Sequence, residues 1–297
     1  MGEIVKRKSI IYIIWGTAAI LLAWGLYIVF DPPAEESIIF FPLNENAQYQ
    51  SADTLLTLND NKVNNLYEVN WKISSVLNQD AYLRQDIGFL FVNGRLKAKM
   101  SEWEQNTDRI VEEDIFRGKE SSLLQAISFH YAEIHDDEEK YTSAQTMSED
   151  GLYVIDSNFS PLSSFRKPDT DAEEEWKAIL EKVTTQQLEY NWEKTMEAFN
   201  INGKEYFQMP LAELPRYNST PPRGFRTEQW KMIVGNLWEG LYKNYFLGIR
   251  TKSGTVVDPE DSSMPLILID PQKGVVLVLL TTKGGEPALL KQTFPVQ

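Results

Sequence analysis

The stretch SIIYIIWGTAAILLAWGLYIVF, residues Ser9–Phe30, decides how the rest of this chain is arranged. It holds 22 residues without a charged side chain, and a helix needs about 20 apolar residues to cross the hydrocarbon core of a bilayer. The stretch therefore predicts a transmembrane anchor that binds the lipid bilayer. Aromatic side chains, which favour the membrane interface, lie toward both of its ends: Tyr12, Trp15, Trp24 and Tyr27.

The charges that flank this stretch predict its orientation. Lys6, Arg7 and Lys8 precede it, whereas acidic residues and Pro32-Pro33 follow it. The positive-inside rule then keeps residues 1–8 in the cytoplasm and exports residues 31–297. A cleaved signal peptide is the alternative, but its apolar core would be about 7–15 residues long and a small-x-small cleavage site would follow. The uncleaved anchor, residues 9–30, fits the sequence better.

Small residues on one face of the predicted anchor suggest a contact within the membrane. Gly16, Ala19 and Ala23 fall three and seven positions apart, which places them on the same side of a helix. Small side chains there let a second helix approach closely. We therefore expect the anchor to pair with itself, giving a homo-oligomer, or with the helix of a membrane partner.

Composition excludes several function classes. The chain has a net charge of −14, which disfavours nucleic acid as a partner because phosphate groups are repelled. It contains no cysteine, so thiolate catalysis, cysteine-based zinc sites and disulfides are excluded. A large exported domain without disulfides suggests a bacterial protein. The sequence points to no cofactor.

Residues 31–50 read as a juxtamembrane linker that leads into a first strand near residues 38–41. Residues 67–74 follow as the clearest strand, since apolar side chains alternate there with polar ones. Further strands are expected at residues 109–116, 123–134 and 152–156. Together, residues 51–165 predict a β-rich antiparallel meander.

A hairpin in this region has a register that can be written down. Asn93-Gly94 is a favoured pair for a two-residue type I′ turn, because both central residues take positive φ. Pairing outward from this turn puts six apolar side chains on one face and Arg95, Lys97 and Lys99 on the other. The expected pairs are Val92 with Arg95, Phe91 with Leu96, Phe89 with Ala98, and Ile87 with Met100.

Residues 166–297 change to a mixed pattern. Thr170 and Glu173 fit a capping box for a helix over about residues 171–199, with a weak point near residues 184–187 and Asn202-Gly203 as its end. A second amphipathic helix starts at Thr227, and two hairpins follow, at residues 245–258 and 266–281. The last of these is apolar on both faces, which predicts central strands covered by the helices. The expected fold class is α+β, with antiparallel sheets packed against two long amphipathic helices behind the anchor.

Catalytic patterns are weak. His130 and His135 are five positions apart and do not form a metal pair; we expect one to be exposed and the other half-buried. A Ser-His-Asp triad would have to use one of these two, and the chain has no Gly-x-Ser-x-Gly elbow. Acidic clusters at residues 112–114 and 136–139 could bind calcium or supply paired carboxylates, but solvated turns explain them better.

The proline-rich loop over residues 210–225 is the candidate partner-binding surface. A long irregular loop in a folded domain is often functional, and Arg and Tyr are common at the centres of interfaces. The alternative is a loop that only packs over the core. The candidate residues are Arg216, Tyr217, Arg223, Phe225 and Arg226.

These patterns favour a non-catalytic, membrane-anchored interaction or regulatory module that binds another envelope or membrane protein, or a ligand, outside the membrane. The alternatives are an envelope hydrolase that uses paired carboxylates and a passive scaffold of a secretion, sporulation or division complex. The cytoplasmic tail of eight residues is too short to form a signalling domain, so an inward signal would have to pass through a partner.

Overall fold

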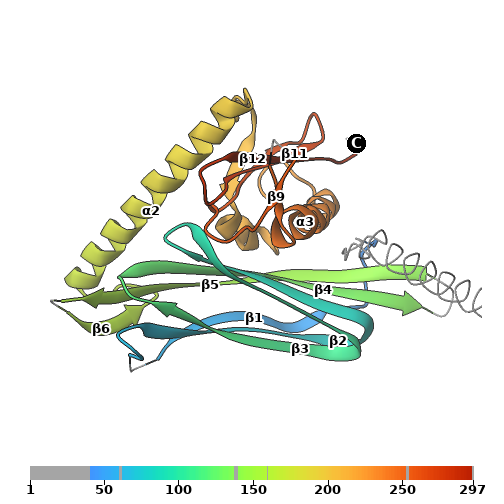
Figure 1. The fold of residues 1–297 in the computed structure, drawn as a ribbon. Helices are drawn as coiled ribbons and strands as arrows, with labels where there is room; N and C mark the ends of the chain where they lie inside the picture. The colour runs from blue at the N-terminus through green and yellow to red at the C-terminus, as the bar shows by residue number, and fades with distance from the viewer. Residues whose placement is uncertain (1–40, 60–61, 137–139, 159, 252–253, 296–297) are drawn as a thin grey trace, which may run out of the picture. The chain divides into compact units, whose positions relative to one another are not determined.

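The longest hairpin of the chain consists of strands β2 (Tyr67–Val92) and β3 (Arg95–Gly118), joined at Asn93-Gly94. Both turn residues take positive φ, at 48° and 75°, as the sequence predicted. The computed structural model describes residues 41–59, 62–136, 140–158, 160–251 and 254–295. They belong to a compact unit that extends from Ile38 to Gln297, and this unit contains the α+β arrangement of Figure 1.

The predicted hairpin register is correct for two pairs and then wrong. Val92 lies opposite Arg95 and Phe91 opposite Leu96, but Leu90 lies opposite Ala98, because β3 carries one extra residue there. Such a bulge moves every later side chain to the other face of the sheet. Ala98 therefore lies on the opposite face of the sheet from Phe89. Lys99 instead lies opposite Phe89, and its Nζ is 4.8 Å from the centre of the Phe246 ring.

The first sheet curls into an almost closed, barrel-like form. Its strand order is β1-β2-β4-β5-β6, with β3 on the other side of β2. β1 pairs with the first half of β2 and β4 with the second half, and the pairing of β2 with β3 shifts between Val76 and Ala81. The two halves thus fold toward each other, which brings β1 against β5: the Leu56 N–H donates to Asp150 at 2.8 Å. The other strands are β1 (Tyr49–Leu58), β4 (Ser122–Asp136), β5 (Lys140–Ser157) and β6 (Ser160–Phe165).

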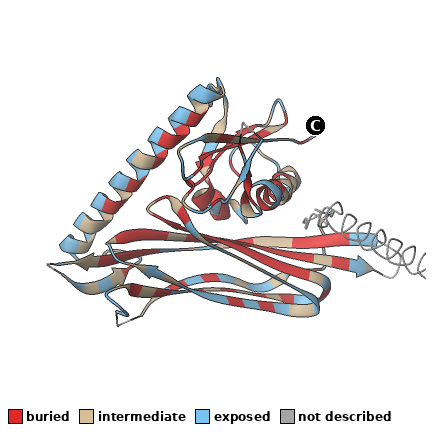
Figure 2. Ribbon diagram, in the orientation of Figure 1, coloured by how far each residue is buried: buried red, intermediate tan, exposed pale blue. Residues whose placement is uncertain are grey.

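The curled sheet is buried on both faces along part of its length. Its inner face, enclosed by the curl, holds the predicted alternating residues of β2: Tyr67, Val69, Trp71 and Ile73 are at most 1% exposed. Its outer face carries Ile87, Phe89, Phe91 and, from β4, Ile127, Phe129 and Tyr131, and these belong to the main core with the C-terminal elements. Figure 2 shows this doubly buried region as red segments of the central strands.

The C-terminal layer packs on that outer face. Helix α3 (Thr227–Leu241) supplies Trp238, whose ring stacks on Phe129 at 4.9 Å and on Phe89 at 5.8 Å. A second antiparallel sheet has the order β12-β11-β10-β7, so that β10 and β11 are central, as their apolar sequences predicted. Its strands are β7 (Phe207–Pro210), β10 (Leu266–Asp270), β11 (Val275–Thr281) and β12 (Pro287–Thr293).

Helix α2 (Asp171–Ala198) confirms the first predicted helix. Thr170 caps it by accepting the Glu173 N–H, and the helix runs without a break through residues 184–187, where a weak point was expected. It ends at Ala198, before the predicted Asn202-Gly203, because Asn200 takes a positive φ of 54°. Buried residues follow one side of α2 and exposed residues the other (Figure 2).

Several boundaries differ from the sequence prediction. The loop over residues 210–225 contains the 3₁₀ helix η2 (Leu211–Tyr217), whose Leu211 and Leu214 side chains are fully buried. After α3 the chain continues as a π-helical turn, η3 (Tyr242–Phe246). The predicted hairpin at residues 245–258 keeps only two short strands, β8 (Ile249–Arg250) and β9 (Val256–Val257). A further 3₁₀ turn is η1 (Gly203–Glu205).

The expected first strand near residues 38–41 begins outside the described residues, and at Phe41 the chain is not in a strand. The first described strand is instead β1. The predicted anchor and its residues Gly16, Ala19 and Ala23 also lie outside the described residues. Among the residues that are described, no helix is long and apolar enough to cross a membrane.

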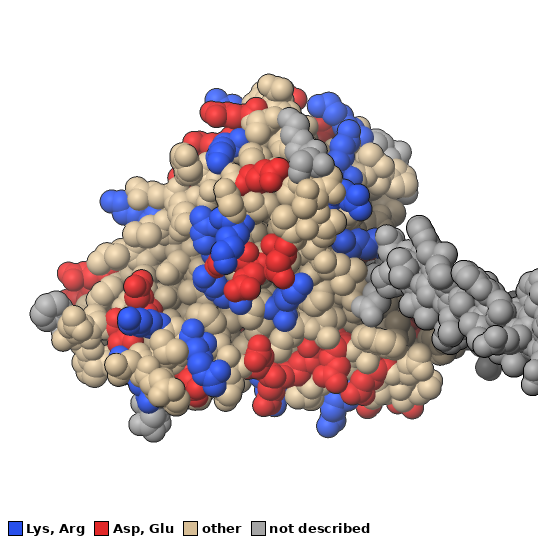
Figure 3. All heavy atoms as spheres, in the orientation of Figure 1, with Lys and Arg blue, Asp and Glu red and all other residues tan. Residues whose placement is uncertain are grey.

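Acidic side chains gather over β2 and β3 in the lower part of Figure 3. Along β3, Glu102, Glu104, Glu113 and Asp114 are exposed. Arg95, the first residue of β3, forms an isolated bridge with Ser263. The rest of β3 pairs only with β2 among the described strands, so it forms an edge of the sheet. Charges on an edge strand discourage pairing with another chain. The acidic region therefore has a structural explanation.

Candidate functional site

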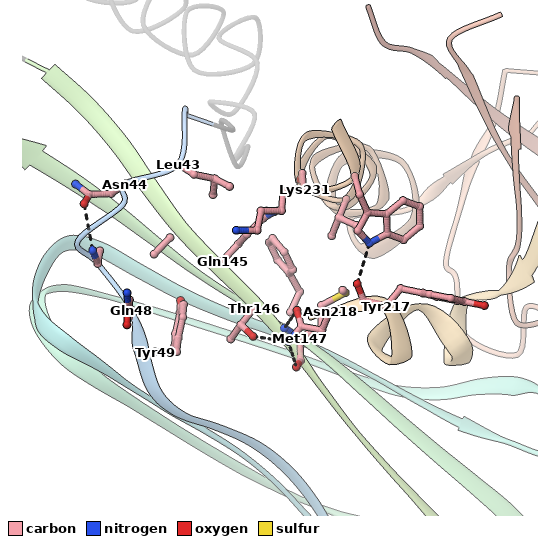
Figure 4. A pocket seen from close by; sticks show the side chains of 15 residues that line it. Leu43, Asn44, Gln48, Tyr49, Gln145, Thr146, Met147, Tyr217, Asn218 and Lys231 are labelled. Carbon is pink, nitrogen blue, oxygen red and sulfur yellow. Dashed lines mark hydrogen bonds between the residues drawn. The ribbon is translucent and has the colours of Figure 1, made fainter. Parts of the chain in front are cut away.

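A pocket of about 360 Å³ lies where the first described segment, strand β5 and helix α3 meet (Figure 4). We call it the β5–α3 pocket. Its lining comes from five parts of the chain that are distant in sequence: residues 43–49, Phe129 of β4, residues 144–147 of β5, residues 217–218 at the end of η2, and residues 230–234 of α3. Pockets formed between elements in this way are the usual place for ligand sites.

The segment that leads in from the predicted anchor forms one wall of this pocket. It is fixed to the edge of β5 at Ser143, whose N–H donates to the Pro42 carbonyl at 2.9 Å and whose carbonyl accepts the Asn44 N–H at 2.8 Å. The Ser143 hydroxyl also donates to the Phe41 carbonyl at 2.6 Å. These bonds hold residues 41–44 in a parallel pairing with β5, so a ligand in the pocket would touch the segment that follows the predicted anchor in sequence.

The pocket has an apolar floor and a polar rim. Phe129, Ala144, Met147, Trp230 and Val234 contribute to the floor, and each is less than 10% exposed. The rim carries amide, hydroxyl and ammonium groups from four parts of the chain. Among them, Gln145 donates from Nε2 to the Lys231 carbonyl at 2.8 Å. This combination of apolar burial and a few polar groups suits specific binding of a small ligand or a peptide end. The polar rim residues include Asn44, Gln48, Gln145, Thr146, Asn218 and Lys231.

The proline-rich loop is fastened beside this pocket by its aromatic rings. Tyr217 and Phe225 lie edge-on to Trp230 at 5.9 and 5.4 Å between ring centroids, and Trp230 Nε1 donates to the Tyr217 carbonyl at 2.9 Å. Asn218 accepts the Met147 N–H at 3.2 Å and so ties the loop to β5. Tyr217 lines the pocket, whereas Phe225 packs under the loop against Phe207.

The candidate loop residues therefore divide into two groups. Tyr217 and Phe225 are half-buried, as expected for a loop packed over the core. Arg216, Arg223 and Arg226 are exposed, and Arg216 forms a long ion pair with Glu213 at 3.6 Å. The aromatic rings fix the loop, and the guanidinium groups remain on the surface. None of the three arginines lines the β5–α3 pocket; Arg216 lines a separate hollow together with Glu149 and Glu213.

The inner face of the curled sheet holds a row of hydrogen-bonded groups that sequence analysis did not find. His130 Nδ1 lies 2.7 Å from Asp86 Oδ2, and His130 Nε2 lies 2.7 Å from Ser148 Oγ. Asp86 and His130 are fully buried. The prediction that the two histidines would be half-buried and exposed is therefore wrong for His130, whereas His135 is exposed and pairs with Glu133.

This row has the distances of a Ser-His-Asp triad but not its setting. Thr54 Oγ1 of β1 lies 2.6 Å from both Ser148 Oγ and Ser128 Oγ, so that the Ser148 hydroxyl is already engaged on two sides. Ser148 also sits within β5, opposite Ser128 of β4, and not at a turn or helix start with free N–H groups that could hold an oxyanion. The arrangement supports closure of the curled sheet, since it joins β1, β2, β4 and β5.

Two further ionisable side chains share this interior. Arg84 is fully buried and donates to Ser75 and to the Asp108 carbonyl, both at 2.5 Å, while its guanidinium lies 5.1 Å from the centre of the Tyr49 ring. Glu112 is 6% exposed. Burial raises the pKa of Glu112 to about 8, and the charges of Asp86 and Glu102 act in the same direction. Burial also raises the pKa of Tyr49, although the nearby Arg84 opposes this.

The carboxylates of the first acidic cluster considered as a metal or hydrolase site, residues 112–114, lie on different sides of β3. Glu112 points into the sheet interior, whereas Glu113 and Asp114 are exposed on β3, and Glu113 accepts a hydrogen bond from Lys72 at 2.6 Å. The solvated turn expected at residues 112–114 is thus wrong, because these residues lie within a strand. Residues 137–139 of the second cluster lie outside the described residues. Nowhere in the described part of the chain do three His, Asp or Glu side chains form a metal-binding group.

One sequence signal could have revealed the buried charges. Strand β2 is apolar on both faces from Phe89 to Val92, which indicates a strand covered on both sides. Arg84 and Asp86 precede this apolar segment in the same strand. Because the strand continues through them, they too lie in the part that is covered on both sides. The pocket residues give no such signal, because Asn, Gln and Lys at the ends and edges of strands resemble ordinary surface.

No known protein family matches the chain, and no curated protein matches it.

Proposed function

We propose that this chain is a single-pass membrane protein whose residues 31–297 act outside the membrane as a non-catalytic interaction module. The β5–α3 pocket and the exposed arginines of the loop that contributes Tyr217 to it would form its recognition surface. One observation carries the proposal: the segment that follows the predicted anchor is itself a wall of the pocket, fixed to β5 by the bonds at Ser143.

This placement supports a regulatory role. A ligand that contacts residues 43–49 and α3 together would favour one position of the juxtamembrane segment over others, because it binds only where both walls are present. Such a ligand could therefore change how the anchor meets its membrane partner. The short cytoplasmic tail makes a partner necessary for any inward signal.

Site-specific photo-crosslinking in living cells tests the proposal. The full chain would carry p-benzoylphenylalanine at Gln48, on the pocket rim, or at Arg223, on the loop; both positions are exposed. Tyr190 on helix α2 is 68% exposed, does not line the pocket and serves as the matched control. We expect one and the same envelope or membrane protein to be joined at Gln48 and Arg223 and to be absent at Tyr190.

Two results would contradict the proposal. The first is an identical set of adducts at all three positions, which would indicate contacts without a defined surface. The second is an adduct at Gln48 that persists unchanged when Arg216, Arg223 and Arg226 are all replaced by Ala, which would remove the loop from the recognition surface.

A further inference from the structure

The β5–α3 pocket differs in charge from the protein that surrounds it. The chain has 43 acidic residues and a net charge of −14, yet none of the described residues that line this pocket is acidic. Its single charged side chain is Lys231, which is exposed and has no ion-pair partner among the described residues. By contrast, Lys243, which follows α3, contacts Glu239 at 3.0 Å. The pocket therefore suits an anionic group in a chain that otherwise repels anions.

A spare hydrogen-bond acceptor lies next to this cation. Gln145 Nε2 donates to the Lys231 carbonyl at 2.8 Å, which fixes the Gln145 amide beside α3. The other end of that amide, Oε1, is buried and accepts no hydrogen bond from the described residues. A buried acceptor without a donor is costly, so a ligand that offers an N–H or O–H gains affinity when the Gln145 side chain turns its Oε1 into the pocket. The ligand thus needs an acidic group and a donor close to each other.

The floor adds a third requirement. Phe129, Met147, Trp230 and Val234 are each at most 6% exposed and present apolar atoms toward the hollow. An apolar side chain of the ligand would be buried there, whereas a group covered with hydroxyls would leave them unpaired. An acidic sugar meets the first two requirements but not this one.

We propose that the β5–α3 pocket binds the C-terminal end of a peptide or protein whose last residue is apolar. The terminal carboxylate pairs with Lys231, the last amide N–H donates to Gln145 Oε1, and the last side chain rests on the apolar floor. Capture of a terminal carboxylate is a known mode of peptide recognition. This inference rests on the proposed function and specifies the chemistry of the partner.

Titration calorimetry on the full chain in lipid nanodiscs tests the inference. The probes are acetyl-Gly-Gly-Leu with a free carboxylate, the same peptide as its C-terminal amide, acetyl-Gly-Gly-Asp, and glucuronic acid as the acidic sugar. We expect the free-carboxylate Leu peptide to bind at least tenfold more tightly than each of the other three, because a hydrogen bond to a charged group and burial of a Leu side chain are each worth about that factor or more. Lys231→Met should weaken its binding at least tenfold, whereas Lys243→Met, outside the pocket, should leave it unchanged.

The inference is overturned if the amide binds as well as the acid, if Lys231→Met has no effect, if glucuronic acid is preferred, or if no peptide binds. These failures are separate from failure of the proposed function. Crosslinking at Gln48 and Arg223 can still identify a partner when the peptide probes do not bind, and the partner would then be recognised by other chemistry.

Discussion

Replacing Glu112 by Gln should remove a large part of the pH dependence of this protein's stability. Glu112 is 6% exposed, and burial raises its pKa from 4.5 to about 8. Between these two values the folded chain keeps the Glu112 proton and the unfolded chain has lost it. Raising the pH therefore favours the unfolded state: the stabilisation is complete below pH 4.5 and is lost as the pH rises through about 8.

The size of the effect follows from the shift. A difference of about 3.5 in pKa corresponds to roughly 5 kcal/mol in total, and the part that falls between pH 5.5 and 7.5 is about 2.5 kcal/mol. Gln has the same shape, stays neutral and keeps an oxygen that can accept the Glu102 N–H. We expect the wild type to lose about 2.5 kcal/mol more than Glu112→Gln over this interval.

Urea unfolding of the full chain in detergent micelles, followed by tryptophan fluorescence at pH 5.5, 6.5 and 7.5, measures this difference. Trp71 and Trp238 are buried and report on both faces of the curled sheet. Glu113→Gln is the matched control, since Glu113 is the next residue of β3 but exposed; it should follow the wild type at each pH. Parallel pH curves for wild type and Glu112→Gln would refute the reasoning, because they would show that Glu112 ionises in the folded protein as it does in water.

Three other predictions concern the interior, the glycines of the sheet and the membrane topology. Ser148 should not react with a fluorophosphonate probe, because it lies within β5, opposite Ser128 of β4, and not at a turn or helix start whose N–H groups could hold an oxyanion. Labelling of the wild type that disappears in Ser148→Ala would instead support hydrolase chemistry. Gly88→Ala should lower the free energy of unfolding by about 1–3 kcal/mol, since an added Cβ would lie 2.3 Å from Ile73 Cδ1. Gly151→Ala is the control: its Cβ would lie no closer than 3.9 Å to any other atom, so it should be close to neutral in the same urea experiment. A tag fused after Gln297 should be cut by protease added to intact cells, and its protection would contradict export of residues 31–297.

Much of the secondary structure follows from local chemistry. The type I′ turn at Asn93-Gly94, the Thr170 cap and the apolar stripe of α3 each depend on residues close together in the chain, and each appears where the sequence predicts it. The alternation from Tyr67 to Ile73 likewise gives the correct buried face of β2. Strands β7 and β12 were not predicted, because neither has a strong pattern and each is held at the edge of the second sheet by a neighbour.

The candidate site was less accessible to sequence reasoning. Tyr217 lines the pocket, and the loop was singled out for its arginines and aromatic rings, but Lys231 and Gln145 had no distinguishing pattern. They become notable only when a strand and a helix 86 positions apart meet through the Gln145–Lys231 bond. Asp86, His130 and Ser148 are a similar case, since each comes from a different strand.

Most helices, turns and apolar strands, and the stretch expected to form an anchor, can be predicted from local sequence, because propensities, capping and hydrophobic periodicity act over a few neighbouring residues. Contacts across the fold set which face each side chain occupies beyond the bulge that separates Leu96 from Ala98, which ionisable groups are buried, and which polar groups surround the pocket. Register, burial and pocket shape depend on contacts between distant segments, and a single extra residue in one strand reverses the face of all that follow it.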